Sequence, residues 1–195
     1  MPSPIAHSAA AYAIYHASRP HLKDRQGPAK RHKAGPLLLV IFLSLLPDFD
    51  FLPGLLTGNI DAFHNTFSHS FFSGFIVAFL GAIVLRWLWS GSAVRWFILV
   101  LVSYELHVLM DYFTFGRGVM LAWPFSDMRH EPPVILFYGL HRSSGLITIK
   151  HLWTVLSEGV FAAAVILVTN YLANRSASNH VAQRAVKTES PISSD

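Results

Sequence analysis

Residues 71–89 read FFSGFIVAFLGAIVLRWLW, an apolar run that contains a single charged residue. A helix needs about 20 apolar residues to cross the hydrocarbon core of a bilayer, so this stretch predicts a transmembrane helix. Two further runs have a similar length, Trp96–Tyr112 and His151–Leu172. Over the whole chain 52% of residues are hydrophobic and 13% are charged, against roughly a quarter charged in soluble domains. The sequence therefore predicts an all-α, polytopic helical membrane protein with three long transmembrane helices.

Two shorter apolar stretches precede the long ones, Ile5–Ala17 and Pro36–Leu46. Each is too short to cross a bilayer comfortably alone, so we expect two short helices that pack on the longer ones as a hairpin or re-entrant element. Thr114–Lys150 is expected to form a polar outer cap. We expect residues 1–172 to form a single helical membrane domain. The Ser- and Asn-rich residues 173–195 are expected to be a disordered polar tail.

The basic residues predict an orientation in the membrane. Arg19–Lys33 carries six of them and is expected to be cytoplasmic by the positive-inside rule. Alternating the spans then places Asp48–Ser70 and Thr114–Lys150 on the outer side, and Ser90–Arg95 and the tail inside. Membrane orientation accounts for the net charge of +4, so no nucleic-acid partner is expected.

Polar residues of the types that bind metal ions, or that hydrogen-bond to metal ligands, lie at the ends of the apolar segments. Histidine and aspartate are costly in or near a bilayer, so their default interpretation there is functional. The predicted topology gathers them at the outer face. Because the chain has no cysteine, a metal site must use imidazole and carboxylate ligands. These residues are His7, Asp48, Asp50, His64, Ser68, His69, His107, Asp111, Asp127 and His130.

Two close pairs stand out among these residues. His107 and Asp111 lie one helical turn apart on one helix face, where both can reach one ion. A buried His–Asp hydrogen bond between helices is the alternative interpretation. Asp48 and Asp50 follow Pro47, and two acids so close repel each other unless a cation or protons intervene. One of them can ligate a metal while the other acts as general base, and a helix-end turn with solvated acids is the alternative.

His64 and His69 flank a short polar segment. Ser68 is expected to cap a helix that begins at His69. A spacing of five places the two histidines about 140° apart on a continuous helix. They would therefore bind different ions, or converge only if the loop bends back. Simple capping with interfacial histidines is the alternative. The segment Trp123–Asp127 is expected to form a turn that lines a substrate entrance or anchors the chain at the membrane interface.

The ordered set of these motifs resembles a known family. His7, Pro47-Asp48-x-Asp50, His64-x4-His69-Ser70, His107-x3-Asp111 and Pro124-Phe125-Ser126 occur in the order typical of the membrane-bound metal-dependent hydrolases of bacterial inner membranes, the YdjM type. The likeness covers roughly residues 5–126 and implies a multi-pass inner-membrane protein. The order His, Asp, His, His-x3-Asp is also distantly similar to zinc-dependent phospholipases C, a fold-level analogy.

Two departures from the family lie in the segment that begins at His64. Where the family usually has His-Arg-x-x-Thr-His-Ser, this chain has Asn65 in place of the arginine and Ser68 in place of the threonine. The hydroxyl is kept, whereas the missing arginine bears on how an anionic substrate is held.

The resulting hypothesis is an integral-membrane, metal-dependent hydrolase that acts on a lipid phosphoester or another membrane-borne ester. The ligands are expected to be His64, His69, His107 and Asp111, with His7 and Asp48 extending the site to a second ion. Asp50 is expected to orient or deprotonate the water, a role that Asp48 can share. Zinc is the first candidate metal and manganese the second.

Two other function classes remain open from the sequence. In a metal-handling or transport protein the same residues would bind an ion transiently, and only Glu105 and Glu158 qualify as ligands deeper in the membrane. In a non-catalytic membrane partner, Arg19–Lys33 or the tail would recruit a cytosolic protein.

Overall fold

The computed structural model describes residues 4–22, 34–59, 62–139 and 149–189. Every element among these residues is helical, apart from isolated bridges that pair Thr114 with Phe137 and Val119 with His130. This confirms the all-α prediction. The α-helices are α1 (Pro4–Leu22), α2 (Gly35–Ser44), α3 (Phe51–Thr57), α4 (Phe71–Trp89), α5 (Ala93–Tyr112) and α6 (Ile149–Glu189). Two short 3-10 helices, η1 (Leu46–Asp50) and η2 (Phe67–His69), join them.

The number of membrane spans agrees with the sequence. By length and composition, α4, α5 and residues Leu152–Ser176 of α6 can each cross a bilayer. The pair formed by α2 and the following segment Leu46–Thr57 passes the same test only together, with a bend of 49° at its break. The described residues therefore contain three candidate spans, or four if the bent pair counts as one.

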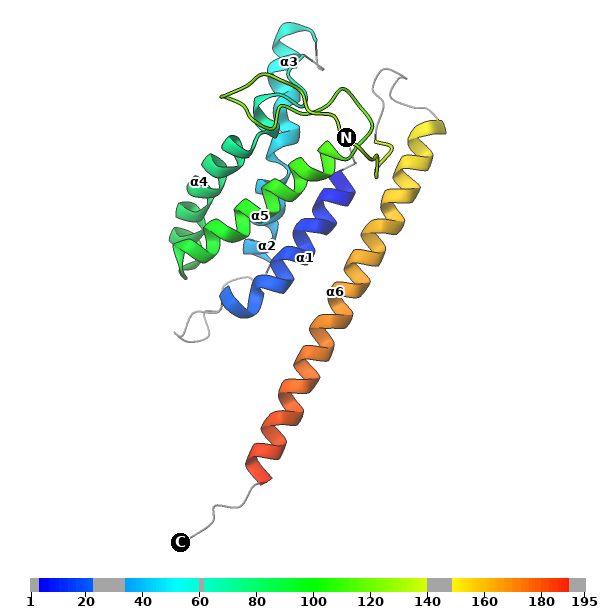
Figure 1. Ribbon diagram of the computed structural model, residues 1–195. Coiled ribbons are helices and arrows are strands. Elements are labelled where there is room, and N and C mark those ends of the chain that lie inside the picture. Colours follow the sequence, from blue (N-terminus) through cyan, green and yellow to red (C-terminus); the bar gives the residue numbers. More distant parts are fainter. Residues whose placement is uncertain (1–3, 23–33, 60–61, 140–148, 190–195) are drawn as a thin grey trace.

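Helix α5 lies at the centre of the molecule. It packs against α1, α2 and α4, while α6 packs along α1 (Figure 1). The start of α1, the end of α5 and the starts of α4 and α6 lie at one end of the molecule, together with η1 (Figure 1). The cap covers this end: Phe71 N–H donates to Leu121 O (3.2 Å), and Met120 N–H donates to Asn65 O (3.3 Å).

The two N-terminal helices differ from the predicted stretches. Helix α1 is 19 residues long rather than confined to Ile5–Ala17, and at 1.5 Å per residue it is about 28 Å long. Helix α2 ends at Ser44, two residues before Leu46, because Pro47 cannot continue an α-helical hydrogen-bond ladder and the chain tightens into η1. The rest of the basic segment, residues 23–33, lies outside the described residues.

The C-terminal segment also differs from the prediction. Helix α6 continues to Glu189, through most of the tail that we expected to be disordered from residue 173. An existing helix extends without a new nucleation cost, and the alanine, arginine and glutamine residues here are good helix formers. In the cap, residues 114–139 are irregular, and residues 140–148 lie outside the described part of the chain.

Candidate metal centre

Seven acidic and imidazole side chains converge at the capped end of the bundle. They come from α1, η1, the segment before η2, η2 itself and α5, so the fold joins residues that are far apart in sequence. Each is at most 9% exposed to solvent. The seven are His7, Asp48, Asp50, His64, His69, His107 and Asp111.

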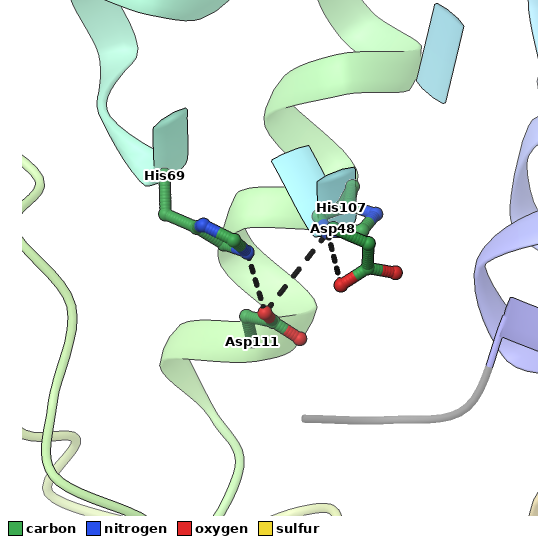
Figure 2. A group of neighbouring side chains, drawn as sticks. All are labelled: Asp48, His69, His107 and Asp111. Atoms are coloured by element: carbon green, nitrogen blue, oxygen red, sulfur yellow. Dashed lines mark ion pairs between the residues drawn. The ribbon is translucent and has the colours of Figure 1, made fainter. Parts of the chain in front are cut away.

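Four of these side chains form a first group, shown in Figure 2. One ligand atom each from Asp48, His69, His107 and Asp111 lies within 4.8 Å of the others. His69 Nε2 lies 2.8 Å from Asp111 Oδ2. His107 Nε2 lies 3.9 Å from the same oxygen and 3.7 Å from Asp48 Oδ1. Two imidazoles and two carboxylates at such distances form a donor set that suits a divalent metal ion.

His7 lies directly beside this first group. Its Nε2 is 3.4 Å from Asp111 Oδ1, and its ring stacks on that of His107 with the ring centroids 3.7 Å apart. Helix α1 therefore contributes to the cluster through its second turn, as the isolated histidine near the N-terminus indicated.

Unsatisfied polar atoms make the first group a candidate site for a cation. Buried polar atoms normally have hydrogen-bond partners, and each one without a partner is costly. Among the described residues, most of the buried side-chain atoms that lack such a partner belong to this group and to His7. They are both carboxylate oxygens of Asp48 and Asp111, both ring nitrogens of His7 and His107, and His69 Nε2.

The short contact between His69 and Asp111 belongs to the same pattern. His69 Nε2 and Asp111 Oδ2 are 2.8 Å apart but are not aligned as a hydrogen bond, so neither atom has a hydrogen-bond partner. Both atoms face the other members of the first group (Figure 2). A divalent cation there would satisfy several of these atoms at once, so the residues present fit a metal.

Asp50 has a different environment, because several hydrogen-bond donors surround its carboxylate. Its carboxylate accepts hydrogen bonds from His64 Nδ1 (3.1 Å), Asn65 N–H (3.0 Å) and Ser68 Oγ (3.2 Å). His69 Nδ1 lies 3.2 Å from the same carboxylate. With His64 and His69, Asp50 forms a second group that geometry alone would also allow to hold an ion.

The backbone between the two histidines explains how both reach Asp50. Asn65 has a φ of 56°, a left-handed conformation that asparagine tolerates better than most residues. The chain turns back there and then forms the short helix η2. The rings of His64 and His69 consequently lie 5.5 Å apart, so the loop bends back rather than separating them.

His69 joins the two groups, since Nδ1 faces Asp50 and Nε2 faces Asp111. In metal sites a carboxylate commonly holds the outer nitrogen of a ligating histidine in this way. Burial alone would lower the pKa of His69, but the carboxylates of Asp111 and Asp50 outweigh it and raise the pKa to about 9. A bound cation would displace that proton. The pKa of His64 is instead lowered, because burial outweighs its hydrogen bond to Asp50.

Comparison with known proteins places the chain in a family. The sequence model of the YdjM inner membrane protein family matches residues 3–181. The chain belongs to the YdjM family. The match contains the whole cluster and confirms the resemblance inferred from the ordered motifs. The protein is accordingly an integral inner membrane protein, multi-pass by its helices.

One curated relative of this YdjM-family chain is the inner membrane protein YbcI of Escherichia coli K12. The two sequences are 35% identical over 97 residues, which cover 48% of this chain and 56% of YbcI. The chain thus spans a little over half the length of that relative. No solved structure matches the chain.

The prediction that Ser68 is the N-cap of a helix beginning at His69 is wrong. Helix α4 begins at Phe71, and its cap is Ser70, whose Oγ accepts from Ser73 N–H at 3.2 Å. The chain first forms η2 and then takes an extended conformation at Ser70, which postpones the helix by two residues. Ser68 donates to Asp50 instead, and Tyr104 Oη donates to its carbonyl oxygen at 2.6 Å.

Four further residues singled out from the sequence lie outside both groups. Asp127 is exposed in the cap, and His130 is paired to Val119 through the backbone. Glu105 faces α4, because a Cβ added to Gly74 would meet its carboxylate. Glu158 lies in α6, which packs on α1.

Aromatic residues gather where the cap meets η2 and the start of α4. Trp123 of the cap contacts Phe67 and Phe72, while Phe125 contacts Phe72 and is 85% exposed. Aromatic side chains of this kind favour the membrane–water interface.

Sequence reasoning missed two arginines of the cap. Arg117 and Arg129 both donate to the carbonyl oxygen of His64, at 3.3 and 3.4 Å. No local spacing pattern could have revealed them, because they lie more than fifty residues from His64 in sequence.

Proposed function

We propose that this protein is an integral-membrane, metal-dependent hydrolase that acts on a lipid phosphoester or another membrane-borne ester. The observation that carries the proposal is the set of buried, unsatisfied nitrogen and oxygen atoms in the first group. Asp48, His69, His107 and Asp111 would hold the cation, with His7 beside them. Zinc is the first candidate and manganese the second. When bound, such an ion acts as a Lewis acid and lowers the pKa of water from ~15.7 to about 7.

The accessible edge of the cluster is narrow. Only Asp48 and His64 have appreciable side-chain exposure, 12% and 10%, whereas the other side chains of the cluster are at most 1% exposed. Water and substrate would therefore reach the site between these two side chains.

The hydrogen bonds favour an orienting role for Asp50. Its oxygens already accept from three donors and lie 3.2 Å from His69 Nδ1, so Asp50 is poorly placed to take a proton from water. It would instead fix the ring orientations of His64 and His69, because an ionised carboxylate accepts their Nδ1–H groups.

His64 is the better candidate for general base. With its proton held on Nδ1 by Asp50, Nε2 is left as an acceptor at the accessible edge. The lowered pKa of His64 keeps the ring neutral at pH 7, which is the form that can accept a proton. Asp48, with two unsatisfied oxygens, would serve the cation and the attacking water together.

The position of the site suits an amphiphilic substrate. The aromatic surface of Phe67, Phe72, Trp123 and Phe125 borders the capped end and matches a membrane interface. The predicted cytoplasmic location of Arg19–Lys33 would place this end at the outer face of the inner membrane. The two groups of described residues that could hold a metal ion share His69 at this end, which favours local chemistry over an ion path through the membrane.

A hydrolysis assay tests the proposal. The purified chain, reconstituted with zinc or manganese, would be incubated with short-chain phospholipids, and the release of phosphate-containing headgroups would be measured. We expect activity in the wild type and its loss in His107→Ala. Ser103→Ala is the matched control, since Ser103 lies one turn earlier on α5 and bonds only to Leu99 O. Equal activity in wild type and His107→Ala would refute the proposal.

A further inference from the structure

Two cationic side chains of the cap converge on the segment that carries His64. Arg117 donates to His64 O at 3.3 Å, and Arg129 donates to the same oxygen at 3.4 Å. Because they share one acceptor, the two guanidinium groups lie within roughly 7 Å of each other. Arg129 also donates to Asn65 O at 3.3 Å and to Gly118 O at 3.1 Å, which fixes its position.

The charge of Arg129 is not compensated by an ion pair with a carboxylate. None of the ion pairs found in the described part of the chain involves Arg129. Burial and the charge of Arg117 both lower the pKa of Arg129, as expected for two cations held close together. The three hydrogen bonds of Arg129 leave two of its five N–H groups for another acceptor.

The location of the pair connects it to the cluster. Both arginines touch the backbone of His64, whose ring is one of the two accessible groups at the edge of the site. Arg117 is exposed, Arg129 is partly buried, and His64 is buried, so the series leads from the surface inward. A ligand that contacts the guanidinium groups would lie next to His64.

We propose that Arg117 and Arg129 form a subsite that binds a phosphate group beside His64. Guanidinium groups match phosphate oxygens in geometry and charge, and two of them can bind one phosphate through several charge-assisted hydrogen bonds. The inference rests on the proposed function in taking that phosphate to be part of the substrate. It narrows the substrate class to anionic phosphoesters, as opposed to neutral esters.

Binding measurements on the full-length chain test this subsite. The protein would be kept in dodecyl maltoside, a detergent without phosphate. The probes are inorganic phosphate, a water-soluble short-chain phosphatidylglycerol, and the diacylglycerol with the same chains, which lacks phosphate. Each titration would be run on metal-loaded protein and again with EDTA.

The test variant is Arg117→Gln/Arg129→Gln, and the matched control is Arg86→Gln. Arg86 also donates to a backbone carbonyl, Gly91 O at 2.8 Å, but it lies in the last turn of α4, and this end of α4 is far from the capped end of the molecule (Figure 1). We expect the double variant to bind phosphatidylglycerol about tenfold more weakly or worse, with diacylglycerol binding unchanged. Arg86→Gln should bind like the wild type. Equal phosphatidylglycerol and phosphate affinities in the double variant and the wild type would overturn the subsite.

Two further comparisons keep the test decisive. If the double variant does not fold, Arg117→Gln alone is used, because Arg117 is exposed and its substitution should not disturb the fold. We then expect weaker phosphate binding, and unchanged binding would overturn the proposal. An arginine-dependent loss with phosphatidylglycerol alone identifies a lipid headgroup as the source, whereas a loss with both probes includes free phosphate.

The EDTA series separates this inference from the proposed function. Arginine-dependent phosphate binding that persists in EDTA supports the subsite. It does so even if the protein never binds metal, a result that would refute the proposed hydrolase. A metal-loaded, active protein whose phosphate affinity is the same in the double variant and the wild type would support the proposed hydrolase and overturn the subsite.

Discussion

Replacing Asp50 with asparagine tests the division of the cluster into ligands and a supporting carboxylate. Asp50 accepts from His64, Asn65 N–H and Ser68, and lies 3.2 Å from His69 Nδ1. Asparagine has nearly the same shape but only one acceptor oxygen, and its amide group presents N–H donors to other donors. The change therefore disturbs the orientation of His69 and leaves the first group otherwise intact.

The expected effect on metal affinity follows from this supporting position. Removing the partner that orients a ligating histidine weakens metal binding about 10- to 100-fold. This corresponds to roughly 1.4–2.7 kcal/mol of binding free energy. The stoichiometry should be retained, because Asp48, His69, His107 and Asp111 remain in place.

The assay is a zinc titration of the purified protein against a chromogenic chelator. Ser68→Ala is the graded control, since it removes one donor to Asp50 and the hydroxyl 3.0 Å from His69 Nδ1 but keeps the carboxylate, and should have a smaller effect. An unchanged zinc affinity in Asp50→Asn would refute the supporting role. Complete loss of one bound ion would also refute it, because Asp50 would then be a ligand of the second group.

Three further predictions concern the base and the packing around the site. His64→Ala should lower hydrolysis about 10²- to 10⁴-fold with metal content unchanged; loss of the metal itself would make His64 a ligand. Tyr104→Phe should lower the unfolding free energy by about 0.5–1.5 kcal/mol in thermal denaturation, because it removes the bond to Ser68 O, and an unchanged midpoint would contradict this. Gly74→Ala should lower the unfolding free energy by about 1–3 kcal/mol by the same measurement, since its Cβ would meet the Glu105 side chain and lie 2.9 Å from Cδ1 of the buried Tyr104 ring. Gly159→Ala, where a Cβ meets nothing within 4 Å, should not destabilise the protein.

The long helices could be predicted because membrane spans depend mainly on local composition. Runs such as residues 71–89 must form their backbone hydrogen bonds internally, so length and hydropathy suffice. The length of α1 could not be predicted in this way, because polar residues such as His16 and Arg19 interrupt its apolar pattern while the helix continues to Leu22. The ends of helices depend on neighbours and on proline, as the early end of α2 before Pro47 illustrates.

The residues of the site could be predicted from the sequence, whereas their division into two groups could not. His107 and Asp111 share a helix face by their spacing alone. Whether His64 and His69 converge depends on the backbone of Asn65, and a φ of 56° at one residue has no reliable sequence signal. The different surroundings of Asp48 and Asp50, two residues apart, likewise arise from tertiary contacts.

The central claim is that the first group binds a metal, and the metal content of the purified protein tests it most directly. Elemental mass spectrometry would be applied to the wild type, to His107→Ala and to the Ser103→Ala control after reconstitution with zinc or manganese. We predict a stoichiometric ion in the wild type and the control, and its loss in His107→Ala. A wild-type protein that binds no metal, or a His107→Ala variant that binds as much as the wild type, would contradict the claim.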